Sequence, residues 1–170
     1  MPTIGDMYTK DVECLGAPRH IEIDDTAGQE AYADLKREKM STGDGYLLVY
    51  SITDDTTFGK LDRVREEIIK AQNGKNIPIF LVGTKADLAA DRAVSEKERL
   101  AKARAWNCKS MEVSAKTDIG INEAFDAIIT DILTLGGDSN KGSGGGSVLG
   151  GGRTAANDLL PQKKKGCIFL

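Results

Sequence analysis

Residues 46–82 read YLLVYSITDDTTFGKLDRVREEIIKAQNGKNIPIFLV, and this stretch decides the fold class. Residues 46–50 form a short continuous apolar run, which is typical of a strand covered on both faces. A second buried strand is predicted over residues 77–82. Between them, residues 56–71 are predicted to form an amphipathic helix, because apolar side chains recur at helical spacing: Phe58, Leu61, Val64, Ile68 and Ile69. Buried strands that alternate with helices indicate right-handed crossovers and a mostly parallel α/β sheet.

The sequence on either side of this stretch continues the pattern. Upstream, the predicted elements are a hairpin of residues 7–16 and 19–24 with its turn at Gly16-Ala17-Pro18, and a helix over residues 31–40. Downstream, Ser95 and Glu98 form a capping box, which predicts a helix from there to about residue 105. The remaining predicted elements are a short strand over residues 111–113 and a last helix that ends at Gly136-Gly137.

Composition separates a structured domain from a tail. The chain has 170 residues, of which 40% are apolar and 29% charged, and this balance is ordinary for one soluble globular domain. A net charge of −3 does not indicate a nucleic-acid-binding protein. Residues 136–152 contain nine glycines in seventeen positions and are expected to be a flexible linker. We therefore predict a domain over residues 1–135 and a disordered, glycine-rich tail over residues 136–170.

The three cysteines of the chain are widely separated. Cys14, Cys108 and Cys167 form neither a disulfide framework nor a zinc-binding spacing. Cys14 and Cys108 are expected to be small buried apolar side chains.

Three short motifs follow predicted strands, and the first is Asp25-Thr26-Ala27-Gly28-Gln29-Glu30. An aspartate at a strand end can hold a hydrated Mg²⁺ ion. A glycine at position 28 allows a backbone amide to approach a phosphate closely, and Gln29 next to it can orient an attacking water. Taken alone, the same string is equally typical of an ordinary turn from a strand into a helix.

The second and third motifs are Thr84-Lys85-Ala86-Asp87 and Ser114-Ala115-Lys116. A carboxylate at Asp87 can accept two N–H hydrogen bonds from guanine, which adenine does not offer. The stem of Lys85 can lie against the base, and a backbone amide in the third motif can meet the guanine O6 atom. The alternatives are a helix-initiating loop with a solvated Lys–Asp pair, and a common Ser-Ala-Lys loop.

Together, the motifs resemble those of Ras-family small GTPases, in the Ras and Rap branch. The resemblance rests on DTAGQE at residues 25–30, GTKADL at residues 83–88 and VSAKT at residues 113–117, with Pro2-Thr3-Ile4 ahead of them. The spacing also matches Ras, with 22 residues from Thr3 to Asp25 and 59 from Asp25 to Thr84. The resemblance covers residues 1 to about 135 and resumes at the last four residues.

The resemblance implies a P-loop NTPase fold of the G-domain type that binds GTP or GDP with Mg²⁺ and hydrolyses GTP. It implies that Thr3 and Asp25 bind the Mg²⁺ ion, that Gly28 donates an amide to the γ-phosphate, and that Gln29 positions the attacking water; Ras is itself the standard example of this chemistry. The implied guanine pocket consists of Thr84, Lys85, Asp87, Ser114, Ala115 and Lys116. The implied protein partners are effectors, exchange factors and GTPase-activating proteins.

The sequence departs from the family pattern at the phosphate-binding loop. The family opens with a strand, a G-x-x-x-x-G-K-[ST] loop and a helix, and this string does not occur in the sequence. We therefore expect a fold without its first strand and helix, with a gap between the strands at residues 19–24 and 46–50. Unpaired backbone groups at that gap predict a marginal or molten chain. Thr84 also stands where Ras has asparagine.

The missing loop leaves three functional alternatives open. The first is a GTP-hydrolysing switch, whose nucleotide affinity and activity in this chain are expected to be low. The second is a nucleotide-free, prenylated binding module, and the third is a non-functional fragment of such a GTPase.

The last residues form a lipidation signal. Cys167-Ile168-Phe169-Leu170 is a C-a-a-X box, whose terminal leucine favours a geranylgeranyl group on Cys167. Residues 163–165 are three lysines, and a polybasic patch is the usual second signal beside a single lipid. The tail therefore predicts an anionic membrane as a partner, at the cytoplasmic face of the plasma membrane.

Overall fold

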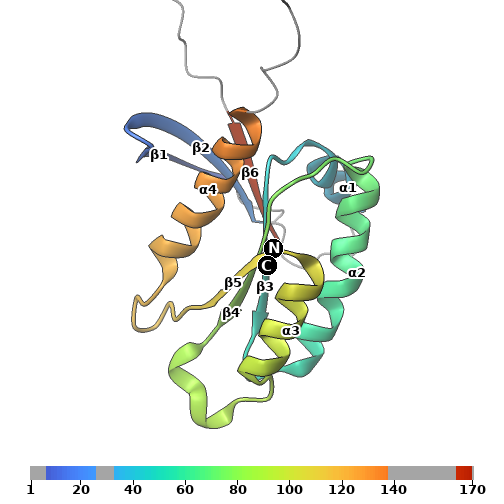
Figure 1. The fold of residues 1–170 in the computed structure, drawn as a ribbon, viewed down its shortest axis with the longest axis vertical. Helices are drawn as coiled ribbons and strands as arrows, with labels where there is room; N and C mark the ends of the chain where they lie inside the picture. The colour runs from blue at the N-terminus through green and yellow to red at the C-terminus, as the bar shows by residue number, and fades with distance from the viewer. Residues whose placement is uncertain (1–6, 26–32, 138–163, 170) are drawn as a thin grey trace, which may run out of the picture.

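The computed structural model describes residues 7–25, 33–137 and 164–169, and its elements follow the order strand, helix, strand along most of the chain (Figure 1). The strands are β1 (Met7–Cys14), β2 (Ala17–Asp25), β3 (Tyr46–Ser51), β4 (Ile79–Thr84), β5 (Lys109–Glu112) and β6 (Lys164–Phe169). The helices are α1 (Ala33–Thr42), α2 (Asp55–Ala71), α3 (Glu96–Trp106) and α4 (Ile121–Gly137), with a 3₁₀ helix η2 (Ala86–Asp91). None of the helices in these ranges is long and apolar enough to cross a membrane.

The described strands form one sheet of six strands in the order β1-β2-β6-β3-β4-β5. Only the pairing of β1 with β2 is antiparallel, and the other four pairings are parallel. The mostly parallel sheet that the sequence predicts is therefore confirmed. In such a sheet the carboxyl ends of the parallel strands share one edge, which is where open α/β sheets bind ligands.

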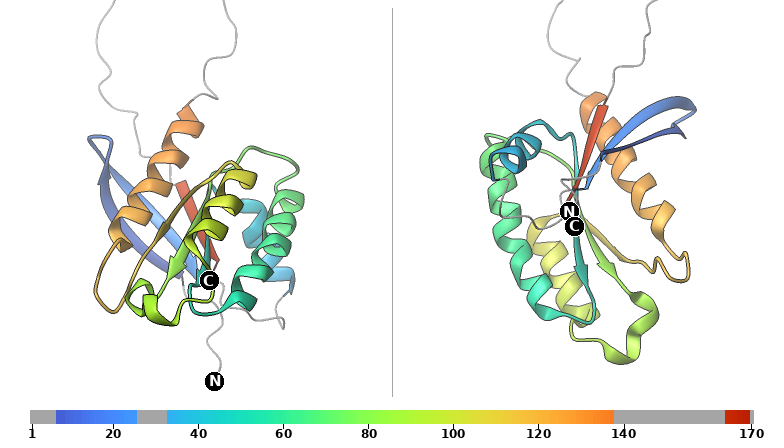
Figure 2. Two further views of the ribbon diagram at one scale, coloured as in Figure 1. Left: turned by 60° about the horizontal axis from the view of Figure 1, so that its bottom comes forward. Right: turned by 180° about the vertical axis from the view of Figure 1, so that it is seen from behind.

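Helices cover both faces of the sheet. Helices α1, α2 and α3 lie on one face and α4 on the other (Figure 2). Strand β3 explains this arrangement, because Tyr46, Leu48 and Tyr50 belong to the core on the side of α2, whereas Leu47 and Val49 belong to the core on the side of α4. A strand with both faces covered needs the continuous apolar run that the sequence shows at this point.

The capping box and the amphipathic pattern are confirmed in the helices. Ser95 accepts a hydrogen bond from the Glu98 amide, and the Glu98 carboxylate accepts one from the Ser95 amide. In α2, Leu61 and Ile68 are buried against the sheet. Cys14 and Cys108 are half-buried rather than fully buried, so the sequence prediction overstated their burial.

The hairpin turn lies one residue earlier than the sequence predicts. Leu15 and Gly16 both have positive φ angles, of 53° and 72°, and Ala17 already begins β2. A two-residue turn with positive φ at both positions matches the right-handed twist of the flanking strands. The prediction placed the turn on Gly16-Ala17-Pro18 because leucine rarely adopts this conformation.

Strand β6 lies between β2 and β3, at the place where the sequence predicts a gap (Figure 1). The expectation of a disordered tail therefore differs from the structure for residues Lys164–Phe169, and residues 138–163 lie outside the described part of the chain. The physical reason is that the facing edges of β2 and β3 carry backbone donors and acceptors that need partners. The last three residues of β6, Cys167, Ile168 and Phe169, are of the apolar types that suit a central strand, whereas Lys164, Lys165 and Gly166 are not.

A buried glutamine joins α2 to the segment between α1 and β3. Gln72 is 3% exposed, and its Nε2 atom donates to the carbonyl oxygens of Met40 at 3.1 Å and Gly43 at 2.9 Å, and to the Tyr46 hydroxyl at 2.5 Å. The Tyr46 hydroxyl in turn donates to the Met40 carbonyl at 2.6 Å. These bonds satisfy carbonyl groups at the end of α1 that no further helical turn can satisfy.

We predict that Gln72→Met lowers the free energy of unfolding by about 1–3 kcal/mol, because it removes the amide group that donates to the buried Gly43 carbonyl and to the buried Tyr46 hydroxyl. Lys70→Met, at an exposed position of the same helix, should change it by less than about 0.5 kcal/mol. Urea unfolding of both variants measures the difference. Equal stabilities of the two variants would contradict the role given to Gln72.

Candidate functional site

The predicted site residues gather at the carboxyl edge of the sheet. Asp25 is the last residue of β2, Thr84 is the last residue of β4, and Ser114 follows the end of β5 by two residues. Since β2, β4 and β5 run in the same direction through the parallel pairings of the sheet, their ends lie on one edge. The structure therefore brings the described members of all three motifs to a common rim.

The second motif turns sharply out of β4. Thr84 Oγ1 donates to the Tyr50 carbonyl at 2.9 Å, and the Ile52 amide donates to the Thr84 carbonyl at 3.1 Å, so the loop is tied to β3. Lys85 has a φ angle of 64° and an exposed side chain. This left-handed residue reverses the chain into η2 and leaves the Lys85 side chain at the rim, where its stem is available to a flat ligand.

Asp87 and Ser114 form the best-defined contact of the site. Ser114 is 1% exposed, and its Oγ atom donates to Asp87 Oδ1 at 2.6 Å and accepts from the Thr117 amide at 3.2 Å. The hydrogen bond from Ser114, together with the positive charge of Lys116, holds the pKa of Asp87 below its ordinary value. Asp87 is exposed and ionised at neutral pH, so the carboxylate is a fixed hydrogen-bond acceptor at the rim.

The third motif is a tight loop that is closed on itself. The backbone of Ser114 exchanges two hydrogen bonds with Ile119, at 2.9 and 3.0 Å, and the Ala86 amide donates to the Val113 carbonyl at 3.1 Å. The second and third motifs are thus joined through backbone as well as through the pair of Asp87 and Ser114. Ala115 and Lys116 lie exposed in the turn between these bonds, so their backbone is presented to solvent at the same rim.

Asp25 carries a buried carboxylate oxygen without a partner. Its Oδ1 atom is buried and has no hydrogen-bond partner within the described ranges. A buried carboxylate oxygen of this kind suits a cation or a metal-bound water. Thr3, Gly28 and Gln29, the other predicted residues of the phosphate and Mg²⁺ part of the site, lie outside the described residues. Residues 7–25, 33–137 and 164–169 contain no group of three or more potential metal ligands.

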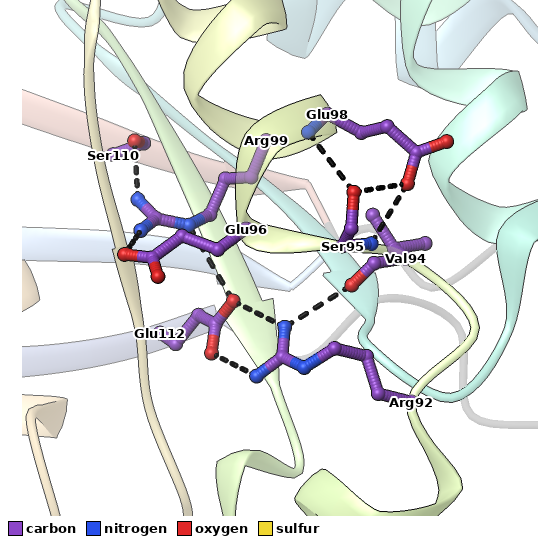
Figure 3. Close-up of polar contacts among 8 residues, drawn as sticks. All are labelled: Arg92, Val94, Ser95, Glu96, Glu98, Arg99, Ser110 and Glu112. Carbon is purple, nitrogen blue, oxygen red and sulfur yellow. Dashed lines mark hydrogen bonds and ion pairs between the residues drawn. The ribbon is translucent and has the colours of Figure 1, made fainter.

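An ion-pair network that the sequence analysis did not identify lies behind the rim (Figure 3). Both Nη atoms of Arg92 bind the Glu112 carboxylate at 2.7 Å, and the Arg99 Nε atom lies 3.5 Å from the same group. Arg99 also donates to Ser110 Oγ at 2.6 Å. These contacts hold α3 and the segment after η2 against β5, immediately before the loop that carries Ser114. The signal was hard to find because the partners are far apart in sequence and match no motif.

The same network affects the ionisation of half-buried Glu112 and buried Tyr50. The hydrogen bond from Arg92 holds the pKa of Glu112 below its ordinary value, and the charge of Arg99 acts in the same direction. Burial, with a smaller contribution from the negative charge of Glu112, raises the pKa of Tyr50 to about 12. Glu112 is therefore the charged group on which this part of the structure depends.

We predict that Glu112→Gln lowers the free energy of unfolding by about 1–3 kcal/mol near neutral pH, because it removes a half-buried carboxylate that is paired with two arginines. Since the folded pKa of Glu112 lies below its unfolded value, the stabilisation is present above the unfolded value of 4.5 and disappears as pH falls through the folded value. The gap between wild type and variant should therefore close in acid. Denaturant unfolding across this pH range measures the stability difference, with Glu66→Gln at an exposed position as the control. A stability difference between wild type and Glu112→Gln that does not change with pH would contradict the prediction.

The comparison with protein families agrees with this arrangement of fold and rim. The model of the Ras family matches residues 1–134, which is most of the chain and includes all three motifs. The match ends within α4, so the tail, including β6, lies outside it. Members of this family are small GTPases that in general bind GTP or GDP with Mg²⁺. The sheet, the rim and the family match together lead to one conclusion: this chain belongs to the Ras family of small GTPases.

Proposed function

We propose that the chain is a guanine-nucleotide-binding switch protein that works at a membrane and recognises its ligand mainly through the base. The observation that carries the proposal is the hydrogen bond from buried Ser114 to exposed Asp87, which fixes an ionised carboxylate at the rim of the sheet. The rest of the rim determines which ligand this carboxylate suits.

Guanine is the base that fits the residues around Asp87. The carboxylate accepts hydrogen bonds but donates none when ionised, so it suits the adjacent N–H groups on one edge of guanine and not the corresponding edge of adenine. The exposed stem of Lys85 can cover one face of the base, and the exposed backbone at Ala115 can donate to the guanine O6 atom. The two hydrogen-bonding contacts, one from each loop, then discriminate guanine from the other bases, whereas the Lys85 stem can pack on the face of any base.

The phosphate end of the ligand depends on fewer residues. Asp25, with its unpartnered Oδ1 atom, would hold the hydrated Mg²⁺ ion together with Thr3. When bound, this ion neutralises charge on the phosphates. In the proposed hydrolysis, Gly28 donates its amide to the γ-phosphate and Gln29 orients the attacking water. No G-x-x-x-x-G-K-[ST] loop, which would add a lysine and a nest of amides to these contacts, occurs among residues 1–170.

A second candidate is a prenylated binding module that works without nucleotide. In the unlipidated chain the position of β6 supports it, because β6 pairs with both β2 and β3 and joins the described strands into one sheet. Under either candidate, effectors, exchange factors and GTPase-activating proteins are the proposed protein partners. The two candidates differ in whether the rim at Asp87 binds guanine.

We predict that a fluorescent GDP analogue binds the full chain, that guanosine and GDP displace it, and that ADP does not. Asp87→Asn should weaken binding by about 10- to 150-fold, because one acceptor oxygen becomes a donor that faces the donors of guanine. Asp91→Asn, at an exposed position at the other end of η2, is the matched control and should leave the affinity unchanged. Fluorescence titration and competition measure these affinities.

Two outcomes of this titration would decide against the proposal. Equal affinities of wild type and Asp87→Asn would show that the base is not read at this site. The absence of binding at millimolar nucleotide would favour the nucleotide-free module instead.

We also propose that the chain is anchored at the cytoplasmic face of the plasma membrane through a lipid on Cys167, with Lys163, Lys164 and Lys165 as the second signal. Replacing the three lysines with glutamine should weaken binding of the lipidated chain to phosphatidylserine-containing vesicles by about 3 kcal/mol, because each lysine contributes about 1 kcal/mol at an anionic surface. Vesicle sedimentation measures this binding. Neutral phosphatidylcholine vesicles are the control, and an equal loss of binding to both would show that the lysines act in another way.

A further inference from the structure

We propose that the slot between β2 and β3 is a binding site for the chain's own residues 164–169, and that occupation of this slot and lipidation of Cys167 exclude each other. The first half of the proposal stands on the backbone pairing of β6 alone. The second half rests on the lipid anchoring that we propose above. The tests below keep the two halves apart.

The backbone pairing shows that the slot accepts a whole strand. On one side, β6 pairs with β2 from Ile21 opposite Lys164 to Asp25 opposite Ile168. On its other side, β6 pairs with β3 from Tyr46 opposite Cys167 to Leu48 opposite Phe169. Both pairings are parallel, so β6 enters with the same direction as its neighbours. Strand β6 therefore bridges the β1–β2 hairpin and the β3–β5 sheet, which have no direct pairing with each other in the described structure.

The elements around the slot are arranged to retain a strand. Helix α1 lies against β6 on one face of the sheet (Figure 2). Lys39 of α1 pairs with Asp24 of β2, and Asp24 lies next to Cys167 in the register. Asp24 is 7% exposed and Tyr46, the neighbour of Cys167 on the other side, is 0% exposed. Cys167 is thus placed between two buried residues and away from the edges of the sheet.

This placement conflicts with lipid transfer to Cys167. In the transfer, the Cys167 sulfur forms a thioether with the first carbon of a prenyl diphosphate. The bond from that carbon to the diphosphate oxygen breaks, and diphosphate leaves with the electron pair. The thiol proton goes to solvent. A transferase must hold the backbone on both sides of Cys167, and in β6 that backbone is paired with β2 and with β3. The strand must therefore leave the slot before the lipid is attached.

The attached lipid also acts against return to the slot. A prenyl chain buries many methylene groups in a bilayer, each of which contributes to membrane binding. Protein interiors are close-packed, so a strand position between Asp24 and Tyr46 is expected to be unsuited to a chain of that size. Lipidation is therefore expected to keep residues 164–169 out of the sheet and to leave β2 and β3 with unpaired facing edges.

A cysteine pair placed in register tests occupation of the slot. In a chain with Cys14→Ser and Cys108→Ser, Glu22→Cys and Lys165→Cys place two thiols at opposed positions of β2 and β6. The matched control is Thr9→Cys with Lys165→Cys, because Thr9 faces Glu22 from the opposite side, on β1. Peptide mapping after mild oxidation should show the Glu22–Lys165 cross-link formed at least about tenfold faster than the control. Equal rates, or no cross-link in either chain, would overturn the docking of β6.

The cross-linked chain then tests the exclusion. With a prenyltransferase and geranylgeranyl diphosphate, it should accept no lipid on Cys167 until dithiothreitol reduces the cross-link. Lipid transfer to the oxidised chain at the rate of the reduced chain would refute the exclusion and leave the docking in place. A peptide of residues 156–170 serves as the reference. If this peptide accepts no lipid, both the proposed anchoring and the exclusion are wrong. The docking of β6 is tested by the cross-link and does not depend on the peptide.

Hydrogen exchange of the unmodified and lipidated full chains provides an independent readout. Within residues 21–25 and 46–48, the amides that point toward β6 should lose at least about tenfold of their protection on lipidation. Amides of β4 toward β5 are the internal control and should keep theirs. Unchanged protection beside β6 after complete lipidation would overturn the exclusion.

Discussion

The hydrogen-bonding capacity of two facing strand edges is the constraint on which the rest of the structure depends. Among the described residues, strands β2 and β3 each have one edge paired, with β1 and with β4, and each has a second edge that pairs with β6. Buried backbone groups without a partner cost about 1–3 kcal/mol each, whereas a typical completed hydrogen bond stabilises by only about 0.5–1.5 kcal/mol. An empty slot would therefore lower the free energy of unfolding by more per backbone group than each completed hydrogen bond contributes to it. It would also divide the sheet into a hairpin and a three-stranded part.

The two parts of the candidate site depend on this constraint to different degrees. The proposed guanine part is built from β3, β4 and β5, in which β4 pairs with both β3 and β5. The ion pairs of Glu112 with Arg92 and Arg99 stabilise this part. Asp25 belongs to β2, which in the described structure is joined to β3, β4 and β5 through β6. The proposed base recognition therefore does not require β6 in the slot, whereas the position of Asp25 relative to the proposed base site depends on the strand between them. This difference is consistent with the proposal that the ligand is held mainly by its base.

Local patterns predicted most of the fold, and long-range contacts did not follow from the sequence. The apolar run at residues 46–50 and the capping box at Ser95 were predicted correctly, because both are determined within a few neighbouring residues. The sequence also placed Asp87 and Ser114 in one site, but not the 2.6 Å hydrogen bond between them. It missed the pairing of Arg92 with Glu112, since twenty residues separate them and neither lies in a motif. It missed β6 because the glycine-rich segment and the C-a-a-X box indicate a flexible, lipidated tail.

The apolar character of the last residues of this chain gives them two possible positions, in the sheet and at a membrane. Ile168 and Phe169 are apolar, and a segment that leaves water favourably for a lipid environment also leaves water favourably for the interior of a sheet. The polar backbone distinguishes the two environments, because the slot pairs it with β2 and β3, whereas a single-lipid anchor leaves it among headgroups and water. Without a lipid, backbone pairing favours the sheet. With a lipid, the many methylene groups of the prenyl chain favour the membrane, so a single covalent change on Cys167 can reverse the balance between the two positions.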